Sequence, residues 1–323
     1  MRRLLPAVSL LSALVLAGCG GGHANVAAPS PATTPTPVPA PTQPTTPGPT
    51  ATASPGHNGG GGTPTKLLVF VEENHSQSQV LSGMPYLASL AGAHGHATAY
   101  DAETHPSLPN YLALVGGSTF GVQDDAPPRA HPLSGDSVFD QAIAHGRSAK
   151  TYAESMPSNC YLSASGDYAV KHNAWAYFAD STPRSNCNRF DVAMGTRGAG
   201  ALASDIATGS LPNIGFAVPN LCNDAHNCPL STADAWLHEW IPRIMSGSDY
   251  RSGRLAIVVT FDEDDRNAGN NVATVVISPR TRQVTSSASY DHYSSLRCAD
   301  EILGVPLLRA AAAARSLCPA FGL

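Results

Sequence analysis

The sequence predicts an α/β fold in which a doubly wound, mostly parallel sheet is flanked by helices. Short apolar runs without polar alternation are typical of strands buried on both faces of a parallel sheet. Such runs occupy residues 67–71, 213–218, 255–261 and 272–278. Segments with helical patterns lie between these runs, and the alternation of strands with helices indicates a doubly wound sheet. The expected helices cover 84–93, 109–117, 136–146, 199–208, 231–246 and 293–303.

The N-terminal part of the chain differs from the rest in composition. A basic start precedes an apolar run over 4–16, which is typical of an export signal. The run leads into Leu-Ala-Gly-Cys19, which resembles the lipobox of bacterial lipoproteins, in which the cysteine is acylated; a signal peptide with a chance cysteine is the alternative. Residues 20–65 contain no Asp, Glu, Lys or Arg and are rich in Pro, Thr and Gly, which predicts disorder. We therefore expect a lipoprotein signal peptide over 1–18, a lipid-anchored Cys19 with a linker over 19–65, and a catalytic domain over 66–323.

Charge and hydropathy exclude two classes of protein. The formal net charge of −5 and the sequence pI near 6.1 argue against an electrostatic nucleic-acid binder. Beyond the first twenty residues, no window reaches the roughly 18 apolar residues that a membrane span needs, which excludes a polytopic membrane protein. We expect contact with the bilayer only through acylated Cys19. The expected location is the periplasmic face of the outer membrane, or the cell surface, if the cell is Gram-negative.

Six cysteines follow Cys19, and an even number in an exported chain predicts up to three disulfides. Six cysteines allow 15 pairings. Pairing of nearest neighbours is the simplest expectation, since it closes the shortest loops. Zinc ligation is the alternative, although the chain has no CxxC motif. The nearest-neighbour pairs are Cys160–Cys187, Cys222–Cys228 and Cys298–Cys318.

Acidic side chains follow three of the expected strands directly or closely. Glu72-Glu73-Asn74 follows the first strand, and Asp262-Glu263 follows the strand over 255–261. The strand over 213–218 is followed by Asp224 and His226. Active groups in such sheets gather at the carboxyl ends of the strands, where these carboxylates would repel one another without a cation. This pattern predicts a metal site, and three separate solvated loops are the alternative.

Ser107 lies near the expected start of a helix. Pro109 suits the first turn, and Gly116-Gly117 suits the end. Ser107 is expected at the N-cap or just before it, where the free backbone N–H groups of the helix also favour a phosphoryl group. A plain capping serine is the alternative interpretation.

Six motifs in order along the chain carry a resemblance to a known family. They are Glu73-Asn74-His75-Ser76, His105-Pro106-Ser107-Leu108-Pro109-Asn110-Tyr111, Lys171-His172-Asn173, Pro219-Asn220-Leu221 with Asp224 and His226, Thr260-Phe261-Asp262-Glu263, and His292-Tyr293-Ser294-Ser295-Leu296-Arg297. Together they resemble the phosphoesterase family of bacterial acid phosphatases and phospholipases C, within the alkaline phosphatase superfamily. The subgroup of secreted acid phosphatases that includes phosphatidylinositol 3-phosphate phosphatases is the most similar.

The resemblance implies an alkaline phosphatase-like fold and a set of site residues. It makes Ser107 the nucleophile, which a metal ion activates and which forms a phosphoserine; Thr104 is the alternative. It implies phosphate binding or leaving-group protonation by His172, His226 and His292, and phosphate binding by Asn110. It assigns the metal ligands Glu73, Asn74, Ser107, Asp262 and Glu263, with Asp224 as an orienting residue or second-metal ligand.

One departure from the family pattern bears on the metal. Members with two zinc ions have Asp-His where this chain has Asp262-Glu263. A ligand set made of oxygen atoms favours Ca²⁺, Mg²⁺ or Mn²⁺. Zinc at Asp224, His226 and His292 is the alternative.

These inferences converge on an exported, lipid-anchored, metal-dependent phosphoesterase. We expect hydrolysis of phosphate monoesters, with activity favoured below neutral pH because protonated histidines bind phosphate better. A phosphodiesterase or phospholipase C acting on phospholipid head groups is the first alternative. A tethered binding module without catalysis is the second.

Overall fold

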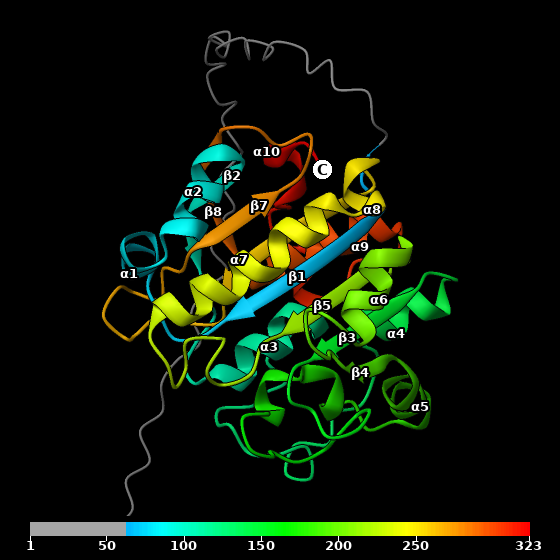
Figure 1. Cartoon of the computed structure of the whole chain (residues 1–323). Coiled ribbons are helices and arrows are strands. Elements are labelled where there is room, and N and C mark those ends of the chain that lie inside the picture. Colours follow the sequence, from blue (N-terminus) through cyan, green and yellow to red (C-terminus); the bar gives the residue numbers. More distant parts are fainter. Residues whose placement is uncertain (1–62) are drawn as a thin grey trace, which may run out of the picture. The chain divides into compact units, whose positions relative to one another are not determined.

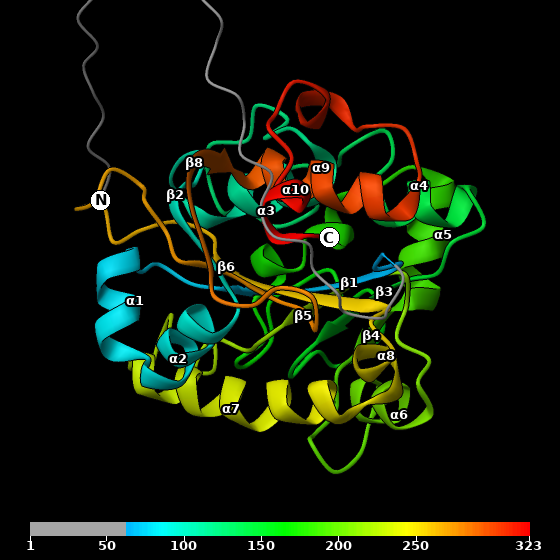
Figure 2. The same ribbon diagram turned by 90° about the horizontal axis from the view of Figure 1, so that it is seen from above.

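The computed structural model describes residues 63–323. The predicted signal peptide, Cys19 and nearly all of the predicted linker lie outside these residues. Within residues 63–323, no helix is both long enough and apolar enough to cross a bilayer. The described part contains one sheet with helices on both faces (Figures 1 and 2).

The sheet has eight strands in the order β4-β3-β5-β1-β6-β7-β2-β8. β1 lies near the centre and pairs in parallel with β5 and β6, while β7 is antiparallel to both of its neighbours. The predicted mostly parallel α/β sheet is thus confirmed. The strands are β1 Lys66–Glu72, β2 Gly95–Asp101, β3 Ala149–Ala153, β4 Asp191–Ala193, β5 Ile214–Val218, β6 Leu255–Phe261, β7 Thr274–Ile277 and β8 Val284–Asp291.

Two helical layers cover the sheet, as the view from above shows (Figure 2). One face carries α3 Ser107–Gly116, α4 Val138–Ala144, α5 Ser181–Phe190, α9 His292–Leu303 and α10 Cys318–Phe321. The other carries α1 Gln77–Gly83, α2 Pro85–Ala93, α6 Ala201–Thr208, α7 Leu230–Ser246 and α8 Ser248–Arg251. Short 3-10 helices span Val170–His172, Ala174–Tyr177 and Arg309–Ala312. The six predicted helices are all present, with ends displaced by one to two residues.

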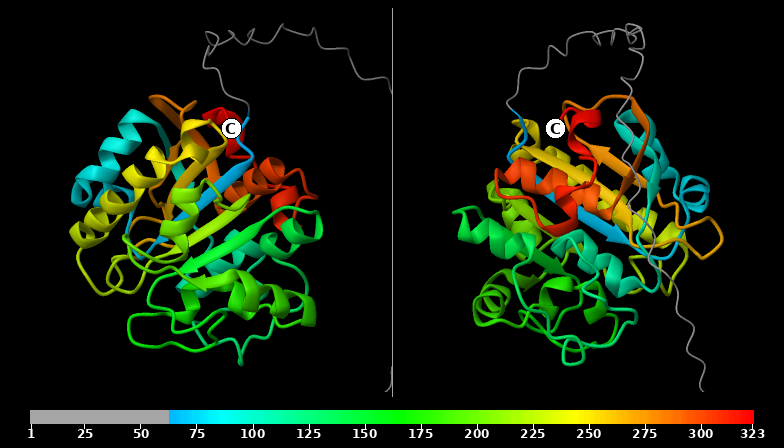
Figure 3. Two further views of the ribbon diagram at one scale, coloured as in Figure 1. Left: turned by 45° about the vertical axis from the view of Figure 1, so that its right-hand side comes forward. Right: turned by 180° about the vertical axis from the view of Figure 1, so that it is seen from behind.

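Long loops beyond α3 and β3 lie together below the sheet, as Figure 1 and both views of Figure 3 show. Backbone bonds between Leu133 and Tyr177, and between Ala179 and Leu133, join them. The three disulfides are Cys160–Cys187, Cys222–Cys228 and Cys298–Cys318, which confirms the nearest-neighbour pairing. Since all six sulfurs are in disulfides, none serves as a zinc ligand.

Candidate active site

The site lies at the carboxyl ends of β1 and β6, where the sheet brings the predicted carboxylates together. Because the two strands run in parallel, Glu72 pairs with Phe261, and the next residues emerge side by side. The Asp262 amide donates to the Glu72 carbonyl at 2.9 Å, and the Asn74 amide donates to Asp262 Oδ1 at 3.0 Å. Asn74 adopts a left-handed backbone with φ 58°, a region that asparagine tolerates better than most residues. The chain thereby turns directly after the strand.

Ser107 is the first residue of α3, with Pro106 in the N-cap position. This differs slightly from the expected N-cap serine and leaves the hydroxyl free for contacts beyond the helix. Its Oγ donates to Glu73 Oε2 at 3.1 Å, and the side chain is buried. The Thr104 hydroxyl instead donates to the His105 carbonyl at 3.2 Å. The geometry therefore favours Ser107 over Thr104 as the reactive hydroxyl.

Glu73 is the centre of a buried hydrogen-bond network. Oε1 accepts from the Tyr111 hydroxyl at 2.8 Å and lies 2.9 Å from His172 Nε2. Oε2 accepts from the side-chain amide of Asn74 at 2.7 Å as well as from Ser107. Burial alone would raise the pKa of Glu73, but the charge and hydrogen bond of His172 outweigh it and lower that pKa to about 2. Glu73 is therefore an anion over the whole working pH range.

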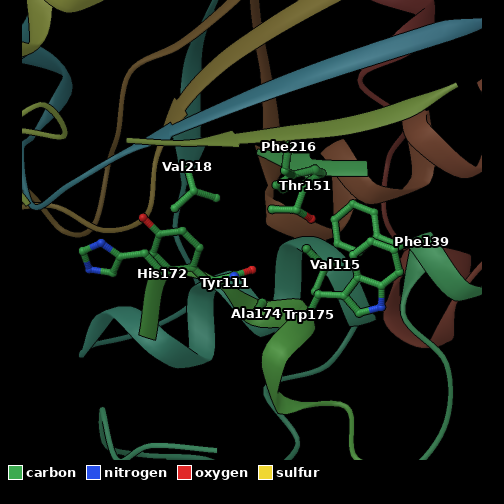
Figure 4. A pocket seen from close by; sticks show the side chains of 10 residues that line it. Tyr111, Val115, Phe139, Thr151, His172, Ala174, Trp175, Phe216 and Val218 are labelled. Carbon is green, nitrogen blue, oxygen red and sulfur yellow. The ribbon is translucent and has the colours of Figure 1, made fainter. Parts of the chain in front are cut away.

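His172 lies between two carboxylates. Its Nδ1 is 3.0 Å from Asp224 Oδ2, opposite the contact with Glu73. The ring stacks on Tyr111 with centroids 5.1 Å apart, and Figure 4 shows the two side chains next to each other. Burial would lower the pKa of His172, but the two carboxylates outweigh it and raise that pKa to about 9. His172 is thus an imidazolium at neutral pH, fixed in orientation.

The Asp262 side chain provides the test of whether the residues fit a cation. Its Oδ2 is buried and has no hydrogen-bond partner within residues 63–323. Burial, followed by the nearby carboxylates Glu73 and Glu263, raises the pKa of Asp262 well above its usual value. A divalent cation between these three carboxylates would satisfy the orphaned oxygen and remove the repulsion. The donors are mostly hard oxygens, so the set fits the ion predicted from the sequence.

Glu263 contacts groups on the loop before α3. Its Oε2 lies 3.1 Å from His105 Nδ1 and accepts from Asn110 Nδ2 at 3.2 Å. Burial is the larger effect on the Glu263 carboxyl and raises its pKa to about 6, although His105 opposes it. Ligand atoms of Glu73, His172 and His226 lie within 4.8 Å of one another, which is a grouping with two nitrogen donors.

Two predicted site residues, Asn110 and His292, make hydrogen bonds to other parts of the protein. Asn110 is fully buried, and its Oδ1 accepts from the backbone amides of Glu103 and Thr104. Its amide donates to the Thr104 carbonyl at 2.7 Å. Asn110 therefore holds the loop that precedes Ser107, and its donation to phosphate stays a prediction.

His292, at the start of α9, is likewise engaged on both ring nitrogens. Nε2 is 2.7 Å from the Asp262 carbonyl oxygen, and Nδ1 is 3.2 Å from the Tyr100 hydroxyl. Burial lowers the pKa of His292 to about 4, so the ring is neutral. His292 supports the Asp262 backbone, and its role as a phosphate ligand, proton donor or zinc ligand stays a prediction.

The predicted residues His226 and Asp224 do reach the site. His226 is exposed, and its backbone amide donates to Asp224 Oδ1 at 2.8 Å. Its ring centroid lies 5.8 Å from that of His172. Asp224 orients His172 from the side away from Glu73, as its predicted orienting role requires.

Lys171 is a site residue for which no role was predicted. Its Nζ donates to Asp125 Oδ2 at 2.9 Å and to Ser107 Oγ at 3.3 Å, and lies 3.4 Å from His226 Nε2. Burial would lower the pKa of Lys171, but Glu73 and Asp125 outweigh it and raise that pKa. The ammonium therefore points at the serine hydroxyl. The only signal for it was its place beside His172 in the third motif.

Glu72 belongs to the acidic run predicted after the first strand, but the sequence assigned it no role of its own. It is fully buried, and neither carboxylate oxygen has a hydrogen-bond partner in the described part of the chain. Burial, followed by the charges of Asp224 and Glu154, raises its pKa well above the usual value. Glu72 is therefore a neutral acid behind the site.

Comparison with known proteins identifies the family. The profile of the Phosphoesterase family matches residues 66–306. The chain belongs to the Phosphoesterase family. It is therefore a hydrolase that acts on phosphoric ester bonds, as the six motifs predicted. The family profile covers both the carboxylates after β1 and β6 and the serine at the start of α3.

Curated members of the family include a phosphatidylinositol-3-phosphatase from Mycobacterium tuberculosis, which is 30% identical over 74% of this chain and 77% of its own length. An acid phosphatase from Aspergillus fumigatus is 29% identical over 65% of this chain. That alignment spans 48% of the fungal protein, about half of its length.

Solved structures show the same fold at low identity. An alkaline phosphatase superfamily protein from Vibrio parahaemolyticus has a TM-score of 0.52 and 10% identity, over 78% of this chain and 70% of that one. The lipoteichoic acid synthase LtaP from Listeria monocytogenes has a TM-score of 0.52 and 8% identity, over 76% of this chain and 73% of that one. The predicted alkaline phosphatase-like fold is thereby confirmed.

Proposed function

We propose that this member of the Phosphoesterase family is a metal-dependent phosphomonoesterase of the acid phosphatase type, with Ser107 as its nucleophile. The observation that carries the proposal is the Ser107 hydroxyl, which lies 3.1 Å from Glu73 and close to the Asp262 carboxyl. The acid phosphatases among the relatives support the choice of monoesters. A divalent cation held by Glu73, Asp262, Glu263 and Ser107, with Asn74 beside them, would stabilise negative charge on the serine oxygen and the phosphoryl group.

The chain's own residues then divide the reaction between them. Ser107 Oγ bonds to phosphorus as the bond between phosphorus and the leaving oxygen breaks, and the electron pair stays on that oxygen. Lys171 faces the phosphoryl oxygens and stabilises their charge, while the His172 imidazolium holds Glu73 in place. Exposed His226 gives the leaving oxygen a proton, while the serine proton passes to solvent. Water then attacks the phosphorus of the phosphoserine and gives a proton to His226. The bond between phosphorus and Ser107 Oγ breaks, phosphate leaves, and Oγ takes a proton from solvent to restore the hydroxyl.

Hydrolysis of p-nitrophenyl phosphate from pH 4 to 9 tests this function. We expect activity that is lost with chelator and restored by Ca²⁺, Mg²⁺, Mn²⁺ or Zn²⁺ added singly, which also identifies the ion. Asp262→Asn should abolish both the activity and the rise in melting temperature that the ion causes. Asp265→Asn, two residues beyond Glu263 and bonded to Gln79, is the matched control and should change neither.

The outcomes separate the rival functions. Cleavage of p-nitrophenylphosphorylcholine without cleavage of the monoester would assign the site to phosphodiesters, as in a phospholipase C. A folded, ion-binding protein that cleaves neither ester would be a tethered binding module. Metal-independent hydrolysis would overturn the mechanism while leaving the family intact.

Export and lipid anchoring at Cys19 form the remaining part of the proposal. The N-terminal sequence supports them, and so do the three disulfides, which are typical of oxidising compartments. Membrane fractionation tests the anchor. We expect the wild type in the membrane fraction and Cys19→Ala in the soluble fraction, whereas equal partition of the two would rule out the anchor.

A further inference from the structure

A cavity of about 480 Å³ opens beside the proposed nucleophile. Its lining includes Lys171, which contacts Ser107, and Asp125 and His226, which both contact Lys171. Lys171 Nζ is 3.3 Å from Ser107 Oγ, so the cavity begins where a phosphoryl group on the serine would meet the rest of its ester. The size falls within the range of small-molecule sites.

The walls of this cavity are mainly apolar. Pro127, Val170 and Leu221 line it, together with Ala164 and Ala169. A sugar or glycerol group would leave most of its hydroxyls without partners on such walls, whereas a ring-sized apolar group would bury its surface favourably. The lining therefore favours an apolar leaving group.

One charged side chain of the lining, Arg129, has no ion-pair partner within residues 63–323. Asp125 is paired with Lys171 at 2.9 Å. Arg129 is exposed and makes no hydrogen bond or ion pair with any residue of the described range 63–323. Its guanidinium suits a carboxylate or phosphate, which it can bind through two parallel hydrogen bonds. The cavity is thus apolar with a single unpaired cation.

The walls are held in place before any ligand binds. The Leu221 amide donates to the Asp167 carbonyl at 3.0 Å, which joins two of the loops that form the cavity. The disulfide Cys222–Cys228 closes one of these loops. The disulfide Cys160–Cys187 brackets the other, which carries Ala164 and Lys171. A preformed pocket loses less entropy on binding and can select its ligand by shape.

Resting on the function proposed above, we propose that this pocket binds the leaving group of the substrate. It selects phosphate monoesters of apolar, ring-sized alcohols that carry a second acidic group, which Arg129 binds. The test compares kcat/KM for 4-carboxybenzyl phosphate, benzyl phosphate and glycerol 2-phosphate. All three esters release an alcohol that is a similarly poor leaving group, so differences in kcat/KM report on the pocket. We expect wild type to prefer the carboxylated ester to benzyl phosphate about five-fold, and benzyl phosphate to glycerol 2-phosphate about ten-fold.

Substitutions at two positions separate the contribution of the Arg129 charge from that of the apolar wall. Arg129→Ala should reduce the preference for the carboxylated ester to about one-fold, and Arg129→Lys should retain part of it. Leu221→Asn should lower the preference for benzyl over glycerol phosphate by about ten-fold. Arg251→Ala, in α8 and outside the pocket lining, is the matched control and should alter neither ratio.

Failure of this inference differs from failure of the proposed function. Wild-type ratios near one, or ratios that Arg129→Ala and Leu221→Asn leave unchanged, would overturn the pocket assignment while hydrolysis itself stands. If no ester is cleaved, calorimetric binding of 4-carboxybenzylphosphonate and benzylphosphonate decides. A preference for the carboxylated phosphonate that Arg129→Ala abolishes would sustain the pocket, and equal or absent binding would reject it.

Discussion

The hydroxyl of Ser107 and the carboxylate of Glu73 are joined by a 3.1 Å hydrogen bond although 34 residues separate them in sequence. Glu73 follows the central strand β1, and Ser107 begins a helix that packs on the sheet. Tyr111, one turn further along that helix, donates to the other oxygen of the same carboxylate. The helix therefore makes hydrogen bonds to both oxygens of the Glu73 carboxylate, and these bonds fix the orientation of the Ser107 side chain.

Ser107→Ala should lower kcat for p-nitrophenyl phosphate by at least about a thousand-fold, because the variant lacks the oxygen that would attack phosphorus. Steady-state hydrolysis and the melting temperature together check that the loss is chemical. Ser82→Ala, at an exposed serine on α1, is the control and should keep full activity. Activity that survives Ser107→Ala and disappears in Thr104→Ala would move the role to Thr104.

Lys171→Ala should lower kcat/KM by about a hundred-fold, since its ammonium is aimed at the serine oxygen. Asp125→Asn should cost less, because Asp125 acts indirectly, by orienting Lys171 and by accepting from the Leu108 amide at the start of α3. A double-mutant cycle measures this coupling, and the two losses should not add.

The pair Lys150–Asp205 offers a comparison for this cycle, because it lies elsewhere in the fold at 2.6 Å. Lys150→Ala should affect stability and leave kcat/KM unchanged. Equal catalytic losses in Lys171→Ala and Lys150→Ala would show that loss of positive charge, rather than its position, is responsible.

Removal of the disulfide Cys160–Cys187 by Cys160→Ser/Cys187→Ser should lower the free energy of unfolding by about 3 kcal/mol. Activity should fall as well, because Lys171 and His172 lie within the loop that it closes. Chemical denaturation and kcat/KM measured on the folded protein check both effects. The double variant Cys298→Ser/Cys318→Ser should cost similar stability, since its loop of 20 residues is comparable, with kcat/KM retained. Equal losses of kcat/KM in both variants would contradict a specific role for the first disulfide.

Asp300 should make the protein less stable as the pH rises toward neutrality. Burial raises its pKa to about 7, and the hydrogen bond from the Leu308 amide only partly opposes this. Because the folded state holds the proton more tightly than the unfolded chain, the stabilisation is complete below the ordinary carboxyl pKa and is lost as pH passes 7. Asp300→Asn keeps an acceptor for Leu308 and removes the ionisation.

The variant should therefore gain stability over wild type by about 1–3 kcal/mol at pH 8 relative to pH 4. Urea denaturation of both proteins at the two pH values measures the difference. A gain of the same size at pH 4 would show that packing, and not the charge, is responsible.

Sequence patterns predicted the strands that are buried on both faces and missed those that are not. β1, β5, β6 and β7 are continuous apolar runs. β8 is a strand of small polar residues whose side chains alternate between half-buried and exposed along most of its length, so apolar content could not reveal it. β2 and β3 mix polar and small residues in the same way, and the short β4 gives little pattern at all. The polar helix α5 was missed for the same reason.

The same limit applies to the site. Residues that follow a strand directly, such as Glu73 and Asp262, could be predicted to meet because parallel strands end at one edge. The contact of Lys171 with Ser107 depends on long loops whose path no periodic pattern encodes. Whether Asn110 and His292 face the cleft or the core is likewise decided by tertiary packing. The family resemblance implied the cleft in both cases.

The central position of β1 has a consequence for how the chain acquires its fold. Its backbone pairs Leu67 with Ile214 and with Ala256, both far along the sequence. During synthesis β1 is therefore made long before β5 and β6. The middle of the sheet can form only after both of these strands have been synthesised. Such high contact order slows folding and leaves an apolar strand unpaired meanwhile. A nascent chain that stops short of β6 would keep that strand open to wrong partners, which makes it a natural client for a holding chaperone.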